Sequence, residues 1–137
     1  MKTDLKKVLA ISGYSGLYKY VSQVKSGIIA ESMQDGKRSM FGIQSRVTAL
    51  SDVSIYRESG EIKLKEVFEK MKTSLKEENA PNAKSEPKVL SEFFVSIIPD
   101  YDKDKFYSSH MKKVVEWYNV LKTNDALEFE EENSSEN

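Results

Sequence analysis

The fold of this chain is indicated most clearly by residues 28–43, which read IIAESMQDGKRSMFGI. Two candidate strands, residues 28–33 and 37–43, lie on either side of the dipeptide Asp35-Gly36. Asp-Gly suits a two-residue type I′ turn, because both central positions of that turn need a positive φ. The stretch therefore predicts an antiparallel hairpin closed by a two-residue turn.

Further short strands surround this hairpin. Residues 17–23 are rich in aromatic and β-branched side chains, and residues 53–56 alternate between apolar and polar. Residues 3–4 can cap a short helix through Leu9, with a strand at residues 8–11 as the alternative. All six glycines of the chain lie in the first 60 residues, where tight turns need them. These features predict a small SH3-like β-barrel or curled antiparallel sheet.

Helical periodicity replaces strand alternation after Gly60. The apolar faces of three expected helices are Leu64, Val67, Phe68, Met71 and Leu75; Leu90, Phe93, Phe94, Ile97 and Ile98; and Met111, Val114, Val115, Trp117, Tyr118 and Leu121. Residues 79–88 contain two prolines and form a polar linker, in which Ser85 can cap the second helix. The third helix is expected to begin near Ser108 or Ser109.

The fold class is therefore α+β, with a β unit at residues 1–60 and a helical unit at residues 61–127 that contains the linker. The segment 128–137 has five glutamates and no Lys or Arg, so we expect a disordered acidic tail. Each unit is marginal in size by itself, which favours packing against the other unit or self-association as a homo-oligomer.

Composition excludes several classes of protein. The chain has no cysteine, so disulfides and thiolate metal sites are ruled out. Its start lacks a signal pattern, and the longest apolar stretch, residues 93–98, is too short to span a bilayer. We therefore expect a cytoplasmic protein without membrane contact.

The net charge of −1 hides a difference between the two units. Residues 1–60 carry nine Lys/Arg and five Asp/Glu, whereas residues 61–137 carry twelve and seventeen. A basic unit can attract anionic partners such as nucleic acid, or the two units can complement each other electrostatically. We favour mutual complementation.

Aromatic and basic side chains of the β unit are the candidate contacts for a partner. They are Tyr14, Tyr18, Lys19, Tyr20, Arg38 and Arg46. Tyr18 and Tyr20 share one face of a strand, and rings beside cations are what single-stranded nucleic acid needs. The same spacing arises in a strand that faces a core, so a structural or protein-contact role comes first.

Other motifs do not predict chemistry. Residues 13–16 read GYSG, which fits a turn better than a phosphate loop. Residues 100–104 resemble the start of a calcium loop, but Lys105 and Met111 occupy positions that need glycine and a carboxylate. The single histidine, His110, suits an exposed first helical turn. No catalytic residue, metal ligand or cofactor is therefore expected.

The chain resembles a bacterial family, the domain of unknown function 5606. The resemblance rests on residues 5–13, 16–19, 27–32, 35–38, 51–56, 99–102 and 112–119. It extends to about Leu127, and at residues 14–15 the family has a more proline-like turn. The resemblance implies a Bacteroidota source and a β-rich head before a helical region, and it assigns no activity.

The expected function is that of a non-enzymatic interaction module, a small adaptor that binds a protein partner. The alternative is binding of RNA or single-stranded DNA through the basic, tyrosine-rich face of the β unit. An enzyme would instead need a deep pocket that holds Asp100, Asp102 or Glu31 beside a tyrosine.

Overall fold

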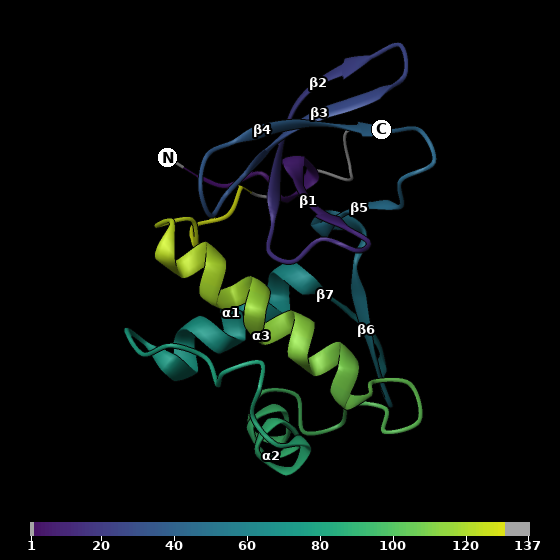
Figure 1. The fold of residues 1–137 in the computed structure, drawn as a ribbon. Helices are drawn as coiled ribbons and strands as arrows, with labels where there is room; N and C mark the ends of the chain where they lie inside the picture. Colours follow the sequence, from purple (N-terminus) through teal and green to yellow (C-terminus); the bar gives the residue numbers. More distant parts are fainter. Residues whose placement is uncertain (1, 131–137) are drawn as a thin grey trace.

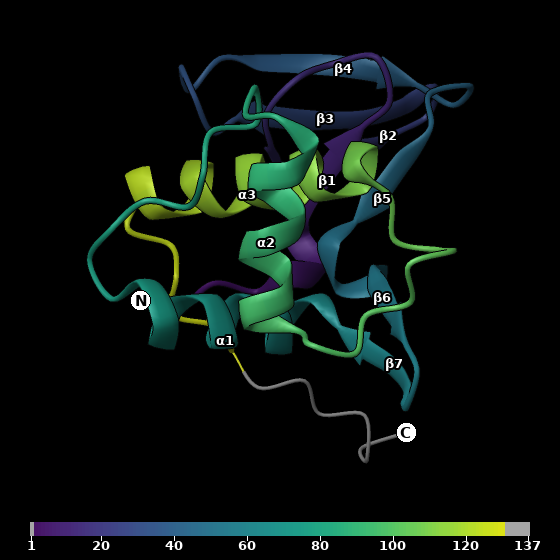
Figure 2. The same cartoon turned by 90° about the horizontal axis from the view of Figure 1, so that it is seen from below.

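The computed structural model describes residues 2–130, whose elements fall into two groups (Figures 1 and 2). The first group is a five-stranded antiparallel sheet of β1 (Val8–Ile11), β2 (Tyr18–Val24), β3 (Gly27–Ser32), β4 (Arg38–Gly42) and β5 (Val47–Ala49). The second group contains the hairpin of β6 (Ser54–Arg57) and β7 (Gly60–Lys63), and the helices α1 (Leu64–Leu75), α2 (Pro87–Ile97) and α3 (Ser108–Thr123). The predicted α+β class with three C-terminal helices is confirmed.

Strand β1 lies inside the sheet, whose order is β4-β3-β2-β1-β5. This order is compatible with an SH3-like arrangement, but β4 and β5 remain as edges and the sheet is not closed. Because side chains alternate along a strand, Val8 joins the core beneath the helices while Leu9 and Ile11 join a second cluster on the opposite face. Burial on both faces explains the uninterrupted apolar run of β1.

The start of the chain contains both structures that the sequence left open. A 3-10 helix, Leu5–Lys7, comes first, and the backbone N–H of Lys6 donates to Asp4 Oδ1 at 2.9 Å. Strand β1 follows at once. The helix therefore ends at Lys7, just before the apolar run, because the residues of that run pair with β2 and β5.

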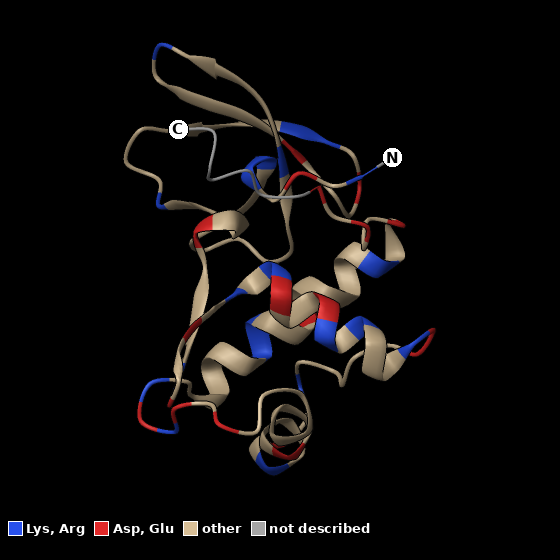
Figure 3. Cartoon of the chain, turned by 180° about the vertical axis from the view of Figure 1, so that it is seen from behind, with Lys and Arg blue, Asp and Glu red and all other residues tan. Residues whose placement is uncertain are grey.

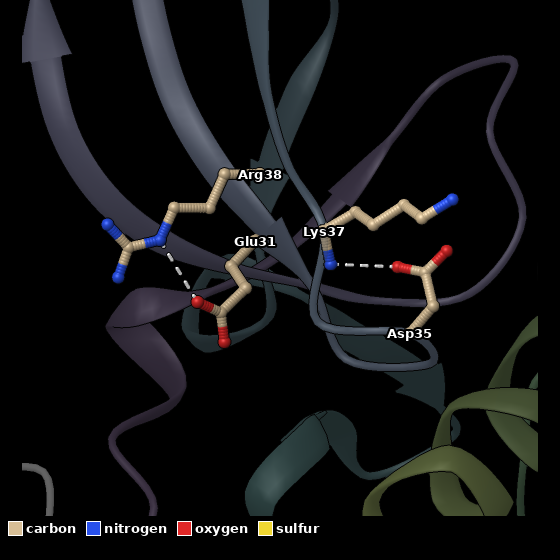
Figure 4. Close-up of polar contacts among 4 residues, drawn as sticks. All are labelled: Glu31, Asp35, Lys37 and Arg38. Atoms are coloured by element: carbon tan, nitrogen blue, oxygen red, sulfur yellow. Dashed lines mark hydrogen bonds and ion pairs between the residues drawn. The ribbon is translucent and has the colours of Figure 1, made fainter.

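The β3–β4 hairpin is present, but its predicted two-residue turn is wrong. Only Gly36 has a positive φ, of 75°, and the N–H of Gly36 donates to the carbonyl of Ser32 across a longer loop. Met33 explains the difference, because it is buried and its N–H donates to the carbonyl of Leu17. Asp35 instead accepts a hydrogen bond from the N–H of Lys37 at 2.9 Å (Figure 4).

The β6–β7 hairpin was only half anticipated. Strand β6 pairs with β7, a strand that sequence periodicity missed, and it takes no place in the five-stranded sheet. Gly60 therefore lies inside a hairpin, at a φ of 117°, whereas the sequence predicts the end of the β unit there. The α2–α3 loop pairs with this hairpin through a bridge between Arg57 and Tyr101.

A carboxylate fastens that loop to the hairpin tip. Asp100 accepts hydrogen bonds from the hydroxyl of Ser59 at 2.8 Å and from its backbone N–H at 3.3 Å. The Ser59 hydroxyl in particular holds the pKa of Asp100 below its usual value, because it stabilises the charged form. This part of the candidate calcium loop therefore has a structural role.

The three helices bury the faces that their periodicity predicted. Their apolar side chains form the main core with Leu5, Val8, Leu17 and Met33 of the β unit. Helix α2 begins at Pro87 as expected, but its N-cap is Glu86 and not Ser85. The shared core joins the two units into one packed structure, as their small sizes require.

The prediction of a disordered tail is wrong for residues 128–130, while residues 131–137 lie outside the described part of the chain. Phe129 is buried and stacks on Phe68, with ring centroids 5.8 Å apart. Thr3 pairs with the same segment, since its N–H donates to Glu128 and its carbonyl accepts from the N–H of Glu130. The burial of one aromatic ring therefore orders residues 128–130 despite the acidic residues on either side of it.

Tyr118 is fully buried, and its hydroxyl has no hydrogen-bond partner among the described residues. Removing that hydroxyl relieves a desolvation cost, so Tyr118→Phe is expected to stabilise the fold by about 1 kcal/mol in urea unfolding. A loss of similar size would instead indicate a partner for the hydroxyl, such as a buried water.

The same residue predicts a loss of stability at alkaline pH. Burial raises the pKa of Tyr118 above its ordinary value of 10.0, so the unfolded chain ionises first. The free energy of unfolding is therefore unaffected by this ionisation below about pH 10, and it decreases as the pH rises through 10 toward the pKa of the folded state. Urea unfolding across this range should show a smaller pH dependence in Tyr118→Phe than in the native chain, and equal slopes would contradict the assignment.

Candidate functional site

The three candidate tyrosines lie on or beside the face of the sheet that carries the second apolar cluster. Tyr14 lies in the β1–β2 turn, and its ring meets Phe41 and Tyr18 edge-on at 5.1 and 6.4 Å. Tyr18 also meets Phe41, at 5.2 Å. Tyr20 is half-exposed next to the β-bulge of β2. Tyr14 and Tyr18 therefore pack on Phe41, a member of the small core of the sheet.

Lys19 and Arg38 lie on the opposite face of the sheet. Lys19 pairs with Glu31 across β2–β3, and Glu31 pairs with Arg38 across β3–β4, so all three side chains share one row. Figure 4 shows Arg38 Nε donating to Glu31 Oε1 at 3.1 Å. Glu31 therefore offsets one of the two positive charges in this row, that of Arg38.

The six candidates thus do not form one aromatic and basic face. Successive side chains of β2 point to opposite faces of the sheet, so Tyr18 and Tyr20 lie on one face and Lys19 on the other. Tyr14 and Arg46 are the one tyrosine and cation of the set that line the same cavity among those found in residues 2–130, and its volume is about 360 Å³. That cavity opens between the sheet and α3.

This cavity is one of three that follow one another along α3. It shares Glu116 with a cavity of about 540 Å³ toward the C-terminus of α3, and it shares Lys113 and Trp117 with one of about 280 Å³ toward the N-terminus. We call the three together the α3 trench. Its other walls come from the β1–β2 turn, the β3–β4 turn, residues 82–84 and β6.

The charge of the α3 trench is opposite to that of the whole chain. Four cations line it, and they are Arg46, Lys84, Lys105 and Lys113. No ion pair engages any of the four within residues 2–130. Lys105 instead lies over the ring of Tyr56, with Nζ 4.9 Å from the centroid. By contrast, α1 carries acidic and basic residues next to one another (Figure 3).

The single carboxylate of the trench lining, Glu116, already has a partner. Its Oε1 accepts a hydrogen bond from the backbone N–H of Gly16 at 3.3 Å. Gly16 has a φ of 80°, and a Cβ there would lie 2.4 Å from Gln34 Oε1. The predicted turn at GYSG is present, and in addition it contacts α3 through Glu116 and the β3–β4 loop through Gln34.

The carboxylates that an enzyme would need lie elsewhere. Glu31 binds Arg38, Asp100 binds Ser59, and Asp102 accepts from the backbone N–H of Asp104. Among residues 2–130 there is no group of three or more His, Cys, Asp or Glu side chains that could hold a metal ion. His110 lines the trench, but its Nδ1 accepts a hydrogen bond from the N–H of Tyr107 at 3.1 Å.

Sequence reasoning missed the α3 side of the trench. Lys113 and Trp117 are four residues apart, so they share one face of α3, and both line two of the cavities. The sequence favours a core position for Trp117 with one edge at an interface, and the residue does pack against the core with part of its surface. An exposed lysine one turn before a half-buried tryptophan was the signal that could have indicated this surface.

None of the helices in residues 2–130 is long and apolar enough to cross a membrane. No curated protein matches the chain. A solution NMR structure of a Bacteroides vulgatus protein, a structural genomics target, is similar with a TM-score of 0.77 and 32% identity. The match covers 94% of this chain and 99% of that chain.

Two family models match the chain on either side of the trench. The model described as domain of unknown function DUF5606 matches residues 5–50, and that described as domain of unknown function DUF6852 matches residues 53–121. The first range holds the five-stranded sheet, and the second holds β6, β7 and the helices. The chain therefore belongs to the Bacteroidota family that joins these two domains of unknown function.

Proposed function

We propose that this protein is a non-enzymatic interaction module, a small cytoplasmic adaptor that binds a protein partner in the α3 trench. The observation that carries the proposal is the gathering of four cations, beside exposed aromatic rings and with a single carboxylate among the described lining residues, at the junction of the two domains. Ligand sites form preferentially at such junctions. The one carboxylate of the lining is engaged with Gly16, which leaves it poorly placed for acid–base chemistry.

The largest of the three trench cavities favours a protein partner over a nucleic acid. Its lining contains Met33, Ala83 and Val120 beside the amides of Gln34, Asn82 and Asn124, and it has no aromatic ring on which a base could stack. Amide side chains can pair with the N–H and C=O groups of another polypeptide. Apolar side chains between them can receive an apolar residue.

Site-specific photocrosslinking in the native bacterium tests the proposal. A p-benzoyl-phenylalanine replaces Thr48 or Thr123, which are exposed residues that line the trench, or Thr73 on α1 as the matched control. We expect adducts from the two trench positions that resist nuclease and disappear on proteolysis of the partner. Adducts that are absent, or equally abundant from Thr73, would refute binding in the trench.

Single-stranded nucleic acid is the second candidate, favoured by the order of rings and cations at the N-terminal end of the trench. Arg46 lies near Tyr14, Lys113 near Trp117, and Lys105 over Tyr56. Phosphate contacts release counterions, so such binding weakens steeply with salt. Binding of labelled random RNA and DNA at low salt would support this candidate, and its absence there would exclude it.

A further inference from the structure

We infer that the α3 trench recognises an extended acidic segment of the partner, with one apolar side chain anchored in the cavity at the C-terminal end of α3. This inference rests on the proposed function and adds the chemistry of the segment. Charge, length and cavity lining each contribute an independent argument.

Charge selects an acidic segment. The four trench cations lack carboxylate partners within the described residues. Glu116 accepts a hydrogen bond from the backbone N–H of Gly16 through one of its oxygens. A chain with a net charge of −1 thus presents a locally positive groove. Complementary potentials raise association rates and select partners, so glutamate or aspartate side chains fit here and lysine or arginine do not.

Length and hydrogen-bonding groups select an extended conformation. Helix α3 has 16 residues and therefore runs for about 24 Å, which is the span of about seven extended residues. The side-chain amide of Gln34 and the hydroxyl of Thr123 have no hydrogen-bond partner within residues 2–130. Both line the largest cavity, where they can pair with the backbone of an extended segment.

The largest of the three trench cavities fits an apolar side chain of the bound segment. Its volume of about 540 Å³ is ample for a leucine or phenylalanine side chain, and Met33, Ala83 and Val120 contribute apolar surface to its lining. One cation, Lys84, lies at this end, whereas the other three lie in the two cavities nearer the N-terminus of α3. The segment therefore places its apolar residue near Val120 and most of its carboxylates near Lys113.

Fluorescence anisotropy with short peptides tests this inference. The probe is a fluorescein-labelled octapeptide with one leucine near one end and four glutamates. The matched peptides replace the glutamates with glutamine, the glutamates with lysine, or the leucine with alanine, and an oligonucleotide of eight thymidines completes the set. We expect the glutamine peptide to bind at least tenfold more weakly, the alanine peptide about threefold more weakly, and the lysine peptide not at all.

Charge reversal in the protein places the binding site. Lys113→Glu and Arg46→Glu each change an exposed residue of the trench, and Lys70→Glu makes the same change on α1 as a control. The first two variants should lose about tenfold in affinity for the acidic peptide, and Lys113→Glu should gain affinity for the lysine peptide. Lys70→Glu should match the native chain, and unchanged melting curves would show that all three variants fold.

The other outcomes overturn the inference. Equal binding of the glutamate and glutamine peptides would refute recognition of an acidic segment, and so would equal losses of affinity in Lys70→Glu and Lys113→Glu. Crosslinks from the trench positions could still support the proposed function in that case. Tighter binding of the oligonucleotide than of the acidic peptide would assign the trench to nucleic acid.

Discussion

Replacing Gly27 with alanine is expected to destabilise the protein by about 3 kcal/mol. A Cβ at this position would lie 2.0 Å from the carbonyl oxygen of Phe41 and 2.9 Å from the Cα of Gly42. Both are backbone atoms of the neighbouring strand β4, which cannot turn aside as a side chain could. Moving β4 would also displace the ring of Phe41, which belongs to the second apolar cluster.

Gly42→Ala provides the matched control, because Gly42 is the direct cross-strand partner of Gly27. Its φ is not positive, and a Cβ there would meet only the side chain of Gln44, at 3.2 Å, and the carbonyl of Ser26, at 3.9 Å. We expect a change of less than about 1 kcal/mol. Urea unfolding of both variants measures the difference, and similar losses in the two would show that β4 accommodates the added methyl.

Phe129→Ala is expected to cost about 3 kcal/mol, the lower end of the range for buried phenylalanines. Phe129 is 7% exposed, and its ring stacks on Phe68 and packs into the main core. The backbone around it pairs with Thr3, and Lys72 Nζ donates to the carbonyl of Leu127 at 2.9 Å. The mutation therefore removes the apolar anchor of a segment that also connects the two ends of the described chain.

Two truncations separate this anchor from the acidic residues beyond it. A chain that ends at Asp125 loses Phe129, the Thr3 pairing and the Lys72 contact, so it should be at least as unstable as Phe129→Ala. A chain that ends at Glu130 keeps all three and should unfold at the same urea concentration as the full chain. If both truncations left the midpoint unchanged, the anchor would not contribute to stability.

The three helices were predictable because their apolar residues repeat at a local period. Leu64, Val67, Phe68 and Met71 lie on one face of α1 whatever that face packs against. Pro87 and Pro99 likewise bound α2 through local backbone geometry. Such features need no knowledge of the rest of the chain, so the sequence predicts them well.

The exact form of the β unit depended on contacts distant in sequence. Asp35-Gly36 indicated the hairpin correctly. The loop of this hairpin is longer than predicted because Met33 is buried in the main core and its N–H donates to Leu17 and not to β4. Strand β7 is only Gly60–Lys63, too short for a clear period, and it forms because β6 lies beside it. The burial of Phe129 could not be predicted from its acidic neighbours, because it depends on the ring of Phe68, which is distant in sequence.

The amino-acid sequence by itself determined the α+β class, the order of a sheet before three helices, and the family. Tertiary structure decided which residues lie together in the α3 trench. Periodicity is a local property, whereas the α3 trench joins Tyr14 and Arg46 of the sheet to Lys113 and Trp117 across about seventy residues or more of chain. Strand alternation put Lys19 and Arg38 on the other face beside Glu31, and only the packing of the two domains shows which charged side chains line a common cavity.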